Sequence, residues 1–372
     1  MIHIFMIDNG EILRDLQNNI SATLTREHYL LTNLKAYDDV DLISIPYKQL
    51  PRTNFVSVIY NNIIKSIVAL NSMYILLKKK PLVFFTYPSS LTTIQNQILF
   101  RFCKYLNLNI VLDVQDTIEQ SEAIGNSKSK LNKNIEKYCL KHAKLLLILN
   151  GKMWQYIKNQ YNLPAKNIVI SPNGFEKNFI EEYPSPYKSI NNRFNICYLG
   201  GITKNRGIDI LVQACLELHE KYPYMKLDLI GFYGEGISKD LKELIETNDF
   251  IVRKEVPRKE IMKMFQDVDT FVMPYNPNEG YLNRSSPTKL YEYIGCGIPI
   301  ICTKCESLIE IGKDGSILYV DYDVEDFKRK IEFLINNPQI REEMSKKLIE
   351  MRSEYLWDKR SLDLYEAIKS LE

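Results

Sequence analysis

Residues 285–301 have the sequence SSPTKLYEYIGCGIPII, which predicts a helix followed directly by a buried strand. Ser286 is a residue type that caps helix N-termini, and Pro287 suits the first helical position. A glycine near the end of the stretch would end the helix, and the apolar run after it predicts a strand. The start of such a helix has free N–H groups and a positive dipole end, which bind anions.

Lys289 and Glu292 lie three residues apart in this predicted helix and therefore share one face. Two interpretations of this face remain open on these residues alone. In one, Lys289 contacts a phosphate and Glu292 accepts hydrogen bonds from two ribose hydroxyls. In the other, the two side chains form an ordinary surface ion pair.

A second informative stretch, residues 198–209, has the sequence YLGGITKNRGID. It follows a predicted strand and precedes an amphipathic helix. Its glycines would allow the backbone to approach a ligand closely, and Arg206 can hold a diphosphate with two hydrogen bonds. The stretch is neither a G-x-G-x-x-G fingerprint nor a P-loop.

Short apolar runs alternate with segments of helical period along the whole chain, which predicts α/β domains with doubly wound parallel sheets. Helical patterns include residues 91–106, 208–221 and 324–336. The strands of the first series are expected at 2–7, 41–45, 82–86, 109–114, 145–149 and 168–171, and those of the second at 194–199, 226–230, 249–252, 270–273, 298–302 and 317–320. The polar, proline-containing stretch between the two series is expected to be a linker.

The overall charge argues against a nucleic-acid binder. The chain has 372 residues with 48 Lys and Arg against 46 Asp and Glu, a net charge of only +2. A dedicated nucleic-acid binder normally has a strong basic excess. The seven cysteines form no disulfide framework and fit a reducing cytoplasm, where we expect the protein to be located.

The longest hydrophobic stretch, from Phe55 to Leu77, is interrupted by Asn and Lys side chains and fails as a membrane span. Lys78, Lys79 and Lys80 follow it. A basic end on an apolar helix is compatible with peripheral contact to an anionic membrane, here the inner face of the cell membrane. The alternative is a buried helix with a solvated lysine end.

The stretches around 200 and 290 resemble the family 4 retaining glycosyltransferases, which have the GT-B fold. Arg206 matches the family's phosphate-binding Lys in charge, and Gly201 stands where the family has an Arg. Glu292 matches the second Glu of the family's Glu-x7-Glu motif, which is implied to bind ribose. Arg284 occupies the position of the first Glu.

The resemblance covers nearly the whole chain. It extends to Pro172–Gly174, to Leu229–Gly231 with Gly234, to Val252–Glu260 and to Trp357. It implies two Rossmann-like domains that face each other across a cleft. The implied segments are an acceptor-side domain at 1–175, a linker at 176–193, a nucleotide-sugar-binding domain at 194–357 and a last helix, 358–372, that packs back on the first domain.

Three residues of the first domain are implied to take part in the site. Gln115 stands where many relatives have His, and can hydrogen-bond a donor sugar hydroxyl. Asp116 could orient an acceptor or cap the next helix. Gly10 lies in a turn after the first strand, where relatives place backbone near the phosphate. The predicted catalytic residues are therefore Gln115 and Asp116, and the predicted donor contacts are Gly10, Gly201, Arg206, Ser286, Thr288, Lys289 and Glu292.

The implied activity is transfer of a hexose, with retention of configuration, from a nucleotide-sugar to a glycan or lipid-linked glycan. A UDP-sugar is favoured, and bacterial surface polysaccharide synthesis is the expected setting. Two Asp-x-Asp pairs, at 267–269 and 321–323, lie beside core strands and are interpreted as turns or caps. We therefore expect neither a metal nor another cofactor.

Two other functions remain as alternatives. The first is a non-catalytic GT-B subunit that binds a glycan or a partner protein, which Gln115 and Arg284 would suit. The second is a nucleotide-sugar epimerase on the same fold. Retention of Arg206, Lys289 and Glu292 favours the transferase, because a pure scaffold needs no nucleotide site.

Overall fold

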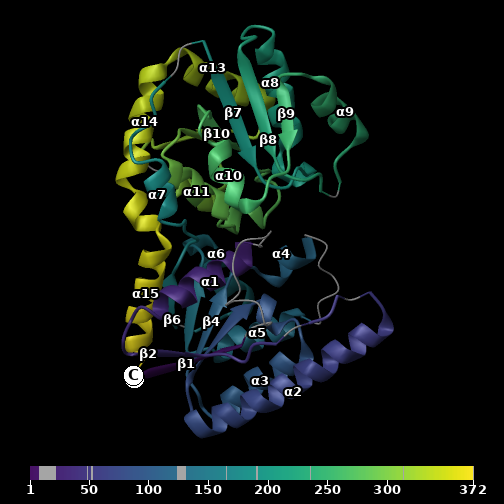
Figure 1. The fold of residues 1–372 in the computed structure, drawn as a ribbon, viewed down its shortest axis with the longest axis vertical. Helices are drawn as coiled ribbons and strands as arrows, with labels where there is room; N and C mark the ends of the chain where they lie inside the picture. Colours follow the sequence, from purple (N-terminus) through teal and green to yellow (C-terminus); the bar gives the residue numbers. More distant parts are fainter. Residues whose placement is uncertain are drawn as a thin grey trace. The chain divides into compact units, whose positions relative to one another are not determined.

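The computed structural model describes residues 1–7, 22–47, 49–51, 53–123, 131–164, 166–189, 192–234, 236–312 and 314–371. Within these ranges the chain forms two compact units (Figure 1), one ending at Pro172 and joined by Trp357 onward, the other spanning Asn173–Leu356. Each unit contains one six-stranded parallel sheet with helices. The predicted α/β class with two Rossmann-like sheets is confirmed, and each predicted strand is present with its ends shifted by at most two residues.

The first sheet has the strand order β2-β1-β3-β4-β5-β6. The central strands β3 and β5 are nearly continuous apolar runs, LVFFTY and LLLI, as expected for parallel strands covered on both faces. The elements of this unit are β1 (Ile2–Ile7), α1 (Ala22–Leu34), β2 (Val40–Ile43), α2 (Phe55–Lys79), β3 (Leu82–Tyr87), α3 (Ile94–Tyr105), β4 (Ile110–Val114), α4 (Ile118–Ala123), α5 (Lys133–His142), β5 (Leu145–Ile148), α6 (Gly151–Tyr161), β6 (Asn167–Ile170) and α15 (Trp357–Lys369). Among the helices that the structure describes, none is long and apolar enough to span a bilayer.

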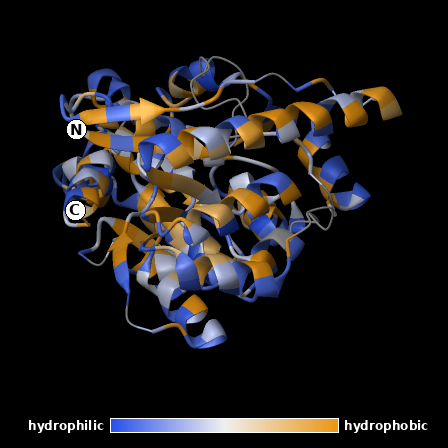
Figure 2. Ribbon diagram, turned by 90° about the horizontal axis from the view of Figure 1, so that it is seen from below, coloured by the Kyte–Doolittle hydropathy of each residue, from blue (hydrophilic) through white to orange (hydrophobic). Residues whose placement is uncertain are grey.

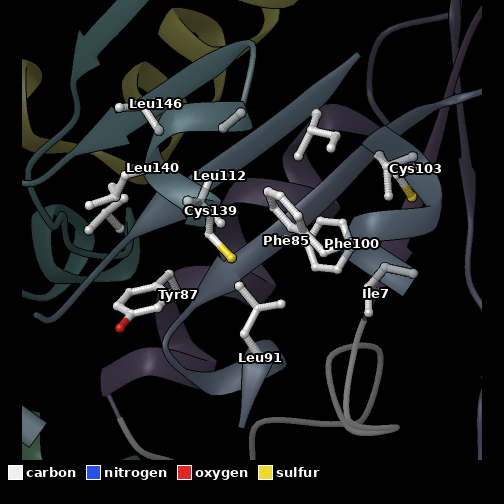
Figure 3. Packing of buried hydrophobic residues seen from close by; sticks show 14 of the residues in the cluster. Ile7, Phe85, Tyr87, Leu91, Phe100, Cys103, Leu112, Cys139, Leu140 and Leu146 are labelled. Atoms are coloured by element: carbon white, nitrogen blue, oxygen red, sulfur yellow. The ribbon is translucent and has the colours of Figure 1, made fainter. Parts of the chain in front are cut away.

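Side chains from strands β1, β3, β4 and β5 and from helices α2, α3, α5 and α6 form the core on one face of this sheet (Figure 3). Phe85, Leu112 and Leu146 come from β3, β4 and β5, and each is fully buried. The ring of Phe100 on α3 lies 5.1 Å from that of Phe85, measured between centroids. Helix α5 adds Leu140 from the other end of the cluster.

Helix α15 belongs to the first unit, although it is the last element of the chain. Its first residue, Trp357, is 1% exposed and stacks parallel to the ring of Tyr29 on α1. The Ser361 hydroxyl donates to the carbonyl oxygens of Tyr29 and Leu30, each at 3.2 Å. These contacts tie the C-terminal helix to α1.

The second sheet has the order β12-β11-β10-β7-β8-β9. The chain runs from β7 outward to β9 and then returns to place β10 on the other side of β7. The elements of this unit are α7 (Asn178–Glu182), β7 (Phe194–Leu199), α8 (Ile208–His219), β8 (Met225–Ile230), α9 (Lys239–Thr247), β9 (Ile251–Lys254), α10 (Arg258–Met264), β10 (Thr270–Met273), α11 (Thr288–Cys296), β11 (Ile300–Thr303), α12 (Glu306–Ile309), β12 (Ile317–Val320), α13 (Val324–Asn336) and α14 (Pro338–Glu350).

The stretch 176–193, which we expected to be a linker, packs on the second unit where the structure describes it. Three aromatic side chains at four-residue spacing, Phe179, Tyr183 and Tyr187, pack on the core of that unit. The Tyr183 hydroxyl also donates to the Met262 carbonyl at 2.6 Å, and the backbone N–H of Tyr187 donates to Ser345 Oγ at 2.7 Å. This aromatic spacing is present in the sequence, but the polar residues around it led us to expect a linker.

Candidate functional site

The strand order of the second sheet identifies the place where a ligand is expected. In an open parallel sheet, ligands bind at the carboxyl ends of strands where the chain reverses its direction of winding. That point lies between β7 and β10, which are adjacent in the sheet. The two stretches singled out in the sequence are the turn after β7 and helix α11, which follows β10.

Two glycines let these segments approach one another. Gly207 has a φ of 64°, and a Cβ atom there would lie 1.8 Å from the carbonyl oxygen of Pro274, just after β10. Gly200 has a φ of 129°, and a Cβ atom there would lie 2.2 Å from the Lys289 ammonium. A side chain at Gly207 would therefore push the β7 turn away from the backbone after β10, whereas one at Gly200 would displace the Lys289 ammonium and would be strained by the positive φ.

The predicted cations Arg206 and Lys289 meet on one aromatic ring. The Arg206 guanidinium carbon lies 4.4 Å from the Tyr275 ring centroid, and Lys289 Nζ lies 5.5 Å from the same centroid. Lys289 Nζ also lies 4.4 Å from the Tyr198 ring centroid and donates to the Tyr198 hydroxyl at 3.3 Å. Tyr198 and Tyr275 are buried, so both cations contact aromatic rings that are largely shielded from water.

The surroundings of Lys289 disfavour the charged form of its side chain. Burial lowers the pKa of the Lys289 ammonium well below its ordinary value, and the nearby Arg206 lowers that pKa further. Within the described residues, no carboxylate forms an ion pair with Lys289. A bound anion would supply the missing counter-charge, because a partly buried cation is costly until it is paired.

Helix α11 begins one residue later than predicted. Pro287 occupies the N-cap position without a side-chain cap, and Thr288 is the first helical residue. The Ser286 hydroxyl does not cap the helix, because it lies 2.7 Å from the Tyr291 hydroxyl and accepts from the Asn173 N–H at 3.2 Å. The hydroxyl of Thr288 is buried and has no hydrogen-bond partner in the described part of the chain. The first turn of α11 thus keeps donors available for a ligand.

Glu292 is more enclosed than a simple cleft-lining carboxylate. It is 2% exposed and forms an ion pair at 2.9 Å with Arg258, the first residue of α10. Arg258 also donates to Glu176 at 2.5 Å, so one guanidinium links two carboxylates. Burial raises the pKa of Glu292, whereas Arg258 opposes that rise. The surface Lys289–Glu292 pair considered from the sequence is not what forms.

Gly201 adjoins the same turn. Its carbonyl accepts from the Tyr198 hydroxyl at 2.9 Å. A Cβ atom at Gly201 would meet only the Phe232 ring, at 3.5 Å, so packing does not require glycine there. Phe232 is 60% exposed, which leaves an aromatic side chain open to solvent beside the turn.

In the first unit, the predicted Gln115 belongs to a buried network. Gln115 Nε2 donates to Asp113 Oδ2 at 2.9 Å, and Arg26 Nε donates to the same oxygen at 2.9 Å. A second bond, from Arg26 Nη2 to Asp113 Oδ1 at 2.8 Å, makes the pair bidentate. Asp116 is partly exposed, and the cap of α4 is provided by the hydroxyl of Thr117, which accepts from the Gln120 N–H at 3.4 Å. The predicted Gly10 contact lies outside the described residues.

Sequence reasoning missed several residues that complete these arrangements. Tyr198 and Tyr275 could have been suspected because they end or follow buried strands at the switch point. Asp113 carried a clear signal, since it is a charged residue inside the buried strand IVLDV. Arg258 and Arg26 carried none, because their partners are far away in the sequence.

Parts of this chain are similar in sequence to known proteins. Residues 179–351 match the family model described as Glycosyl transferases group 1. An uncharacterized glycosyltransferase of Methanocaldococcus jannaschii is 25% identical over 255 residues, which are 65% of this chain and 64% of that protein. The capsular polysaccharide biosynthesis glycosyltransferase CapM of Staphylococcus aureus is 28% identical over 187 residues, 46% of each chain. The aligned parts therefore span less than two thirds of either relative.

A crystal structure of Anabaena HepE in complex with UDP superimposes with a TM-score of 0.69 and covers 100% of both chains at 14% identity. A second structure of that protein, in complex with UDP-glucose, has a TM-score of 0.66. The chain has the GT-B fold of glycosyltransferases, and residues 179–351 of its second unit match glycosyl transferases group 1.

Proposed function

We propose that this protein is a glycosyltransferase whose second unit binds a nucleotide-sugar. The observation that carries the proposal is the pair of cations, Arg206 and Lys289, on the Tyr275 ring. The diphosphate of the donor would lie between these cations and the first turn of α11. Departure of a nucleoside diphosphate builds negative charge, which preorganised cations and a helix N-terminus stabilise.

The nucleoside would be held through Glu292, four residues beyond the first residue of α11. Its ion pair with Arg258 favours the ionised form, which accepts hydrogen bonds from ribose hydroxyls. Arg258 and Glu176 would act as positioning residues for this carboxylate.

We further propose a UDP-sugar donor and a polysaccharide or glycolipid acceptor. The structural likeness to Anabaena HepE bound to UDP-glucose supports the donor, and the likeness to CapM supports the acceptor class. In the proposed reaction the bond from the anomeric carbon to the phosphate oxygen breaks, and the acceptor oxygen forms its new bond on the same face. The leaving phosphate accepts the acceptor's proton, so the reaction needs neither a metal nor a protein base. Gln115 and Asp116 remain predicted contributors from the first unit.

Calorimetric titration with UDP, GDP and dTDP tests the donor proposal directly. We expect UDP to bind most tightly, and Arg206→Ala to weaken UDP binding by roughly tenfold or more, the scale of a charge-assisted hydrogen bond. Lys239→Ala, at an exposed lysine of the same unit, is the matched control and should bind UDP like the wild type. Equal UDP affinity in Arg206→Ala and the control would refute the assigned site.

Release of UDP from UDP-sugars distinguishes an enzyme from a binding subunit. The transferase should release UDP when an acceptor glycan is added, with the product's anomeric configuration retained in its NMR spectrum. UDP-sugar binding without turnover across acceptor glycans would instead favour the non-catalytic GT-B subunit.

A further inference from the structure

Helix α2 is built with its polar side inward. Its buried positions recur every three or four residues and are mostly polar: Ser57, Asn61, Lys65, Ala69, Ser72 and Leu76. Residues three and four apart share a helix face, so these six positions form the side that packs on the unit. A helix that covers a core normally turns its apolar stripe toward it.

Eight large apolar residues of α2 lie on the opposite face, whereas Ala69 and Leu76 belong to the inward face. Between 41% and 71% of each is exposed, and their spacing again follows the helical period: Val56, Ile59, Tyr60, Ile63, Ile67, Leu70, Tyr74 and Leu77. Figure 2 shows hydrophobic colour along this long helix, which can be found from its label in Figure 1. Such an exposed apolar stripe indicates an interaction surface.

The neighbouring helix α3 extends this surface. Ile94, Ile98 and Tyr105 recur along one side of α3 and are 46%, 49% and 85% exposed. The two helices are linked by a hydrogen bond from Gln95 Nε2 to Ser66 Oγ at 3.3 Å. We call the eight apolar residues of α2 together with these three residues of α3 the α2–α3 face.

The segment that forms the α2–α3 face has basic residues but no acidic ones. Residues 42–112 contain no Asp or Glu but eight Lys or Arg, whereas the whole chain has a net charge of only +2. Exposed lysines 78, 79 and 80 end α2, and Arg101 and Lys104 are exposed on α3. This excess is local, because the rest of the chain is net acidic.

We propose that the α2–α3 face docks on the surface of an anionic lipid bilayer. Helix α2 would lie along the membrane, with its apolar stripe at the boundary of the acyl chains and its lysines among the headgroups. An amphipathic helix with a basic polar part binds in this way, and each Lys near an anionic surface strengthens the binding. The proposal does not depend on the identity of the donor.

A second copy of the chain fits the same face less well. A symmetric contact would bring two acid-free, positively charged regions together, which like-charge repulsion opposes. An anionic bilayer supplies both the apolar layer and the counter-charge that the face lacks.

Flotation of the full-length protein with lipid vesicles tests the proposal. We expect the protein to float with vesicles of phosphatidylcholine and phosphatidylglycerol, and to remain unbound with phosphatidylcholine alone. The triple change Ile63→Gln, Ile67→Gln, Leu70→Gln should lower the partition coefficient by about tenfold or more, as should Lys78→Gln with Lys79→Gln. Gln is a good helix former, and all five positions are exposed, so Tm should stay close to that of the wild type.

Matched controls lie in the second unit. Leu244 and Phe333 are 39% and 41% exposed, and their Gln variants should float like the wild type, as should Lys239→Gln with Lys346→Gln. Wild-type protein that fails to float with anionic vesicles would overturn the proposal, as would triple-Gln protein that floats like the wild type. A concentration-dependent dimer that the triple change abolishes, without vesicle binding, would make the face an interface between copies. Unchanged UDP affinity in every variant keeps this test separate from the donor site.

Discussion

Replacing Lys289 with Met separates ligand binding from stability at the candidate site. Met is close to Lys in length and can pack against Tyr198 and Tyr275, but it has no charge to offer a diphosphate. We expect UDP affinity to fall by roughly 1.5–3 kcal/mol, the contribution of a hydrogen bond to a charged group. The lost cation–π contacts, about 0.5–2 kcal/mol, are offset by sulfur–aromatic packing and by removal of a half-buried charge.

The free energy of unfolding of Lys289→Met should therefore stay within about 1 kcal/mol of the wild type or rise. Calorimetric titration with UDP and urea denaturation of the same samples measure the two quantities. Lys239→Met, at an exposed lysine, controls for loss of a charge elsewhere. Unchanged UDP affinity in Lys289→Met would refute the role of this lysine, and strong destabilisation would show that its ammonium holds the fold together.

The lowered pKa of Lys289 adds a pH signature to the same comparison. Between that lowered pKa and the usual value near 10.5, the unfolded chain binds more protons at this residue than the folded chain does. Stability should therefore rise with pH across this window, relative to Lys289→Met. Because a diphosphate favours the ammonium, UDP binding in this window should take up protons, which titrations in buffers of different ionisation enthalpy detect. Equal proton uptake by wild type and Lys289→Met would contradict the assignment.

Three further predictions concern the carboxylates and the absence of a metal. Glu176→Gln and Glu292→Gln each remove one charged partner of Arg258 and should change the urea midpoint of unfolding similarly. Only Glu292→Gln should also weaken UDP binding, by about tenfold or more. Equal UDP affinity in the two variants would exclude a ribose contact by Glu292. Asp113→Ala leaves the buried Arg26 without its carboxylate and should cost about 3–5 kcal/mol of unfolding free energy, whereas adding Arg26→Met should recover much of it, as denaturation in a double-mutant cycle measures. Sugar transfer should persist in excess EDTA, and a loss of turnover that Mn²⁺ or Mg²⁺ restores would contradict metal independence.

Much of the fold could be predicted from the sequence because its signals are local. Parallel strands covered on both faces are rich in apolar residues, so short apolar runs predicted the strands of both sheets, including IVLDV with its single charged residue. The glycines at 200 and 207 predicted the turn after β7 in the same way. In the structure both have positive φ angles, which favour glycine. The shared helix face of Lys289 and Glu292 followed from their spacing alone.

Which side chains those residues meet depended on contacts between distant segments. The return of β10 to the side of β7 brings Arg206 and Lys289 to one Tyr275 ring, and no local pattern encodes that strand order. The ion pair between Glu292 and Arg258 likewise joins two helices that are far apart in the sequence.

Helix α2 is the clearest case of a property that only tertiary structure decided. Its sequence showed an apolar helix with a lysine end, and burial of the apolar side was one of the two interpretations. Its inward face instead uses mainly small and polar residues, with Leu76 as the one large apolar side chain that is fully buried in the described part of the helix. Asn61 bonds the backbone of Leu50 through both its amide oxygen and its amide nitrogen. Periodicity determines which residues share a face, but only the packing partners determine which face turns inward, because burial is a property of the neighbours as well as of the helix.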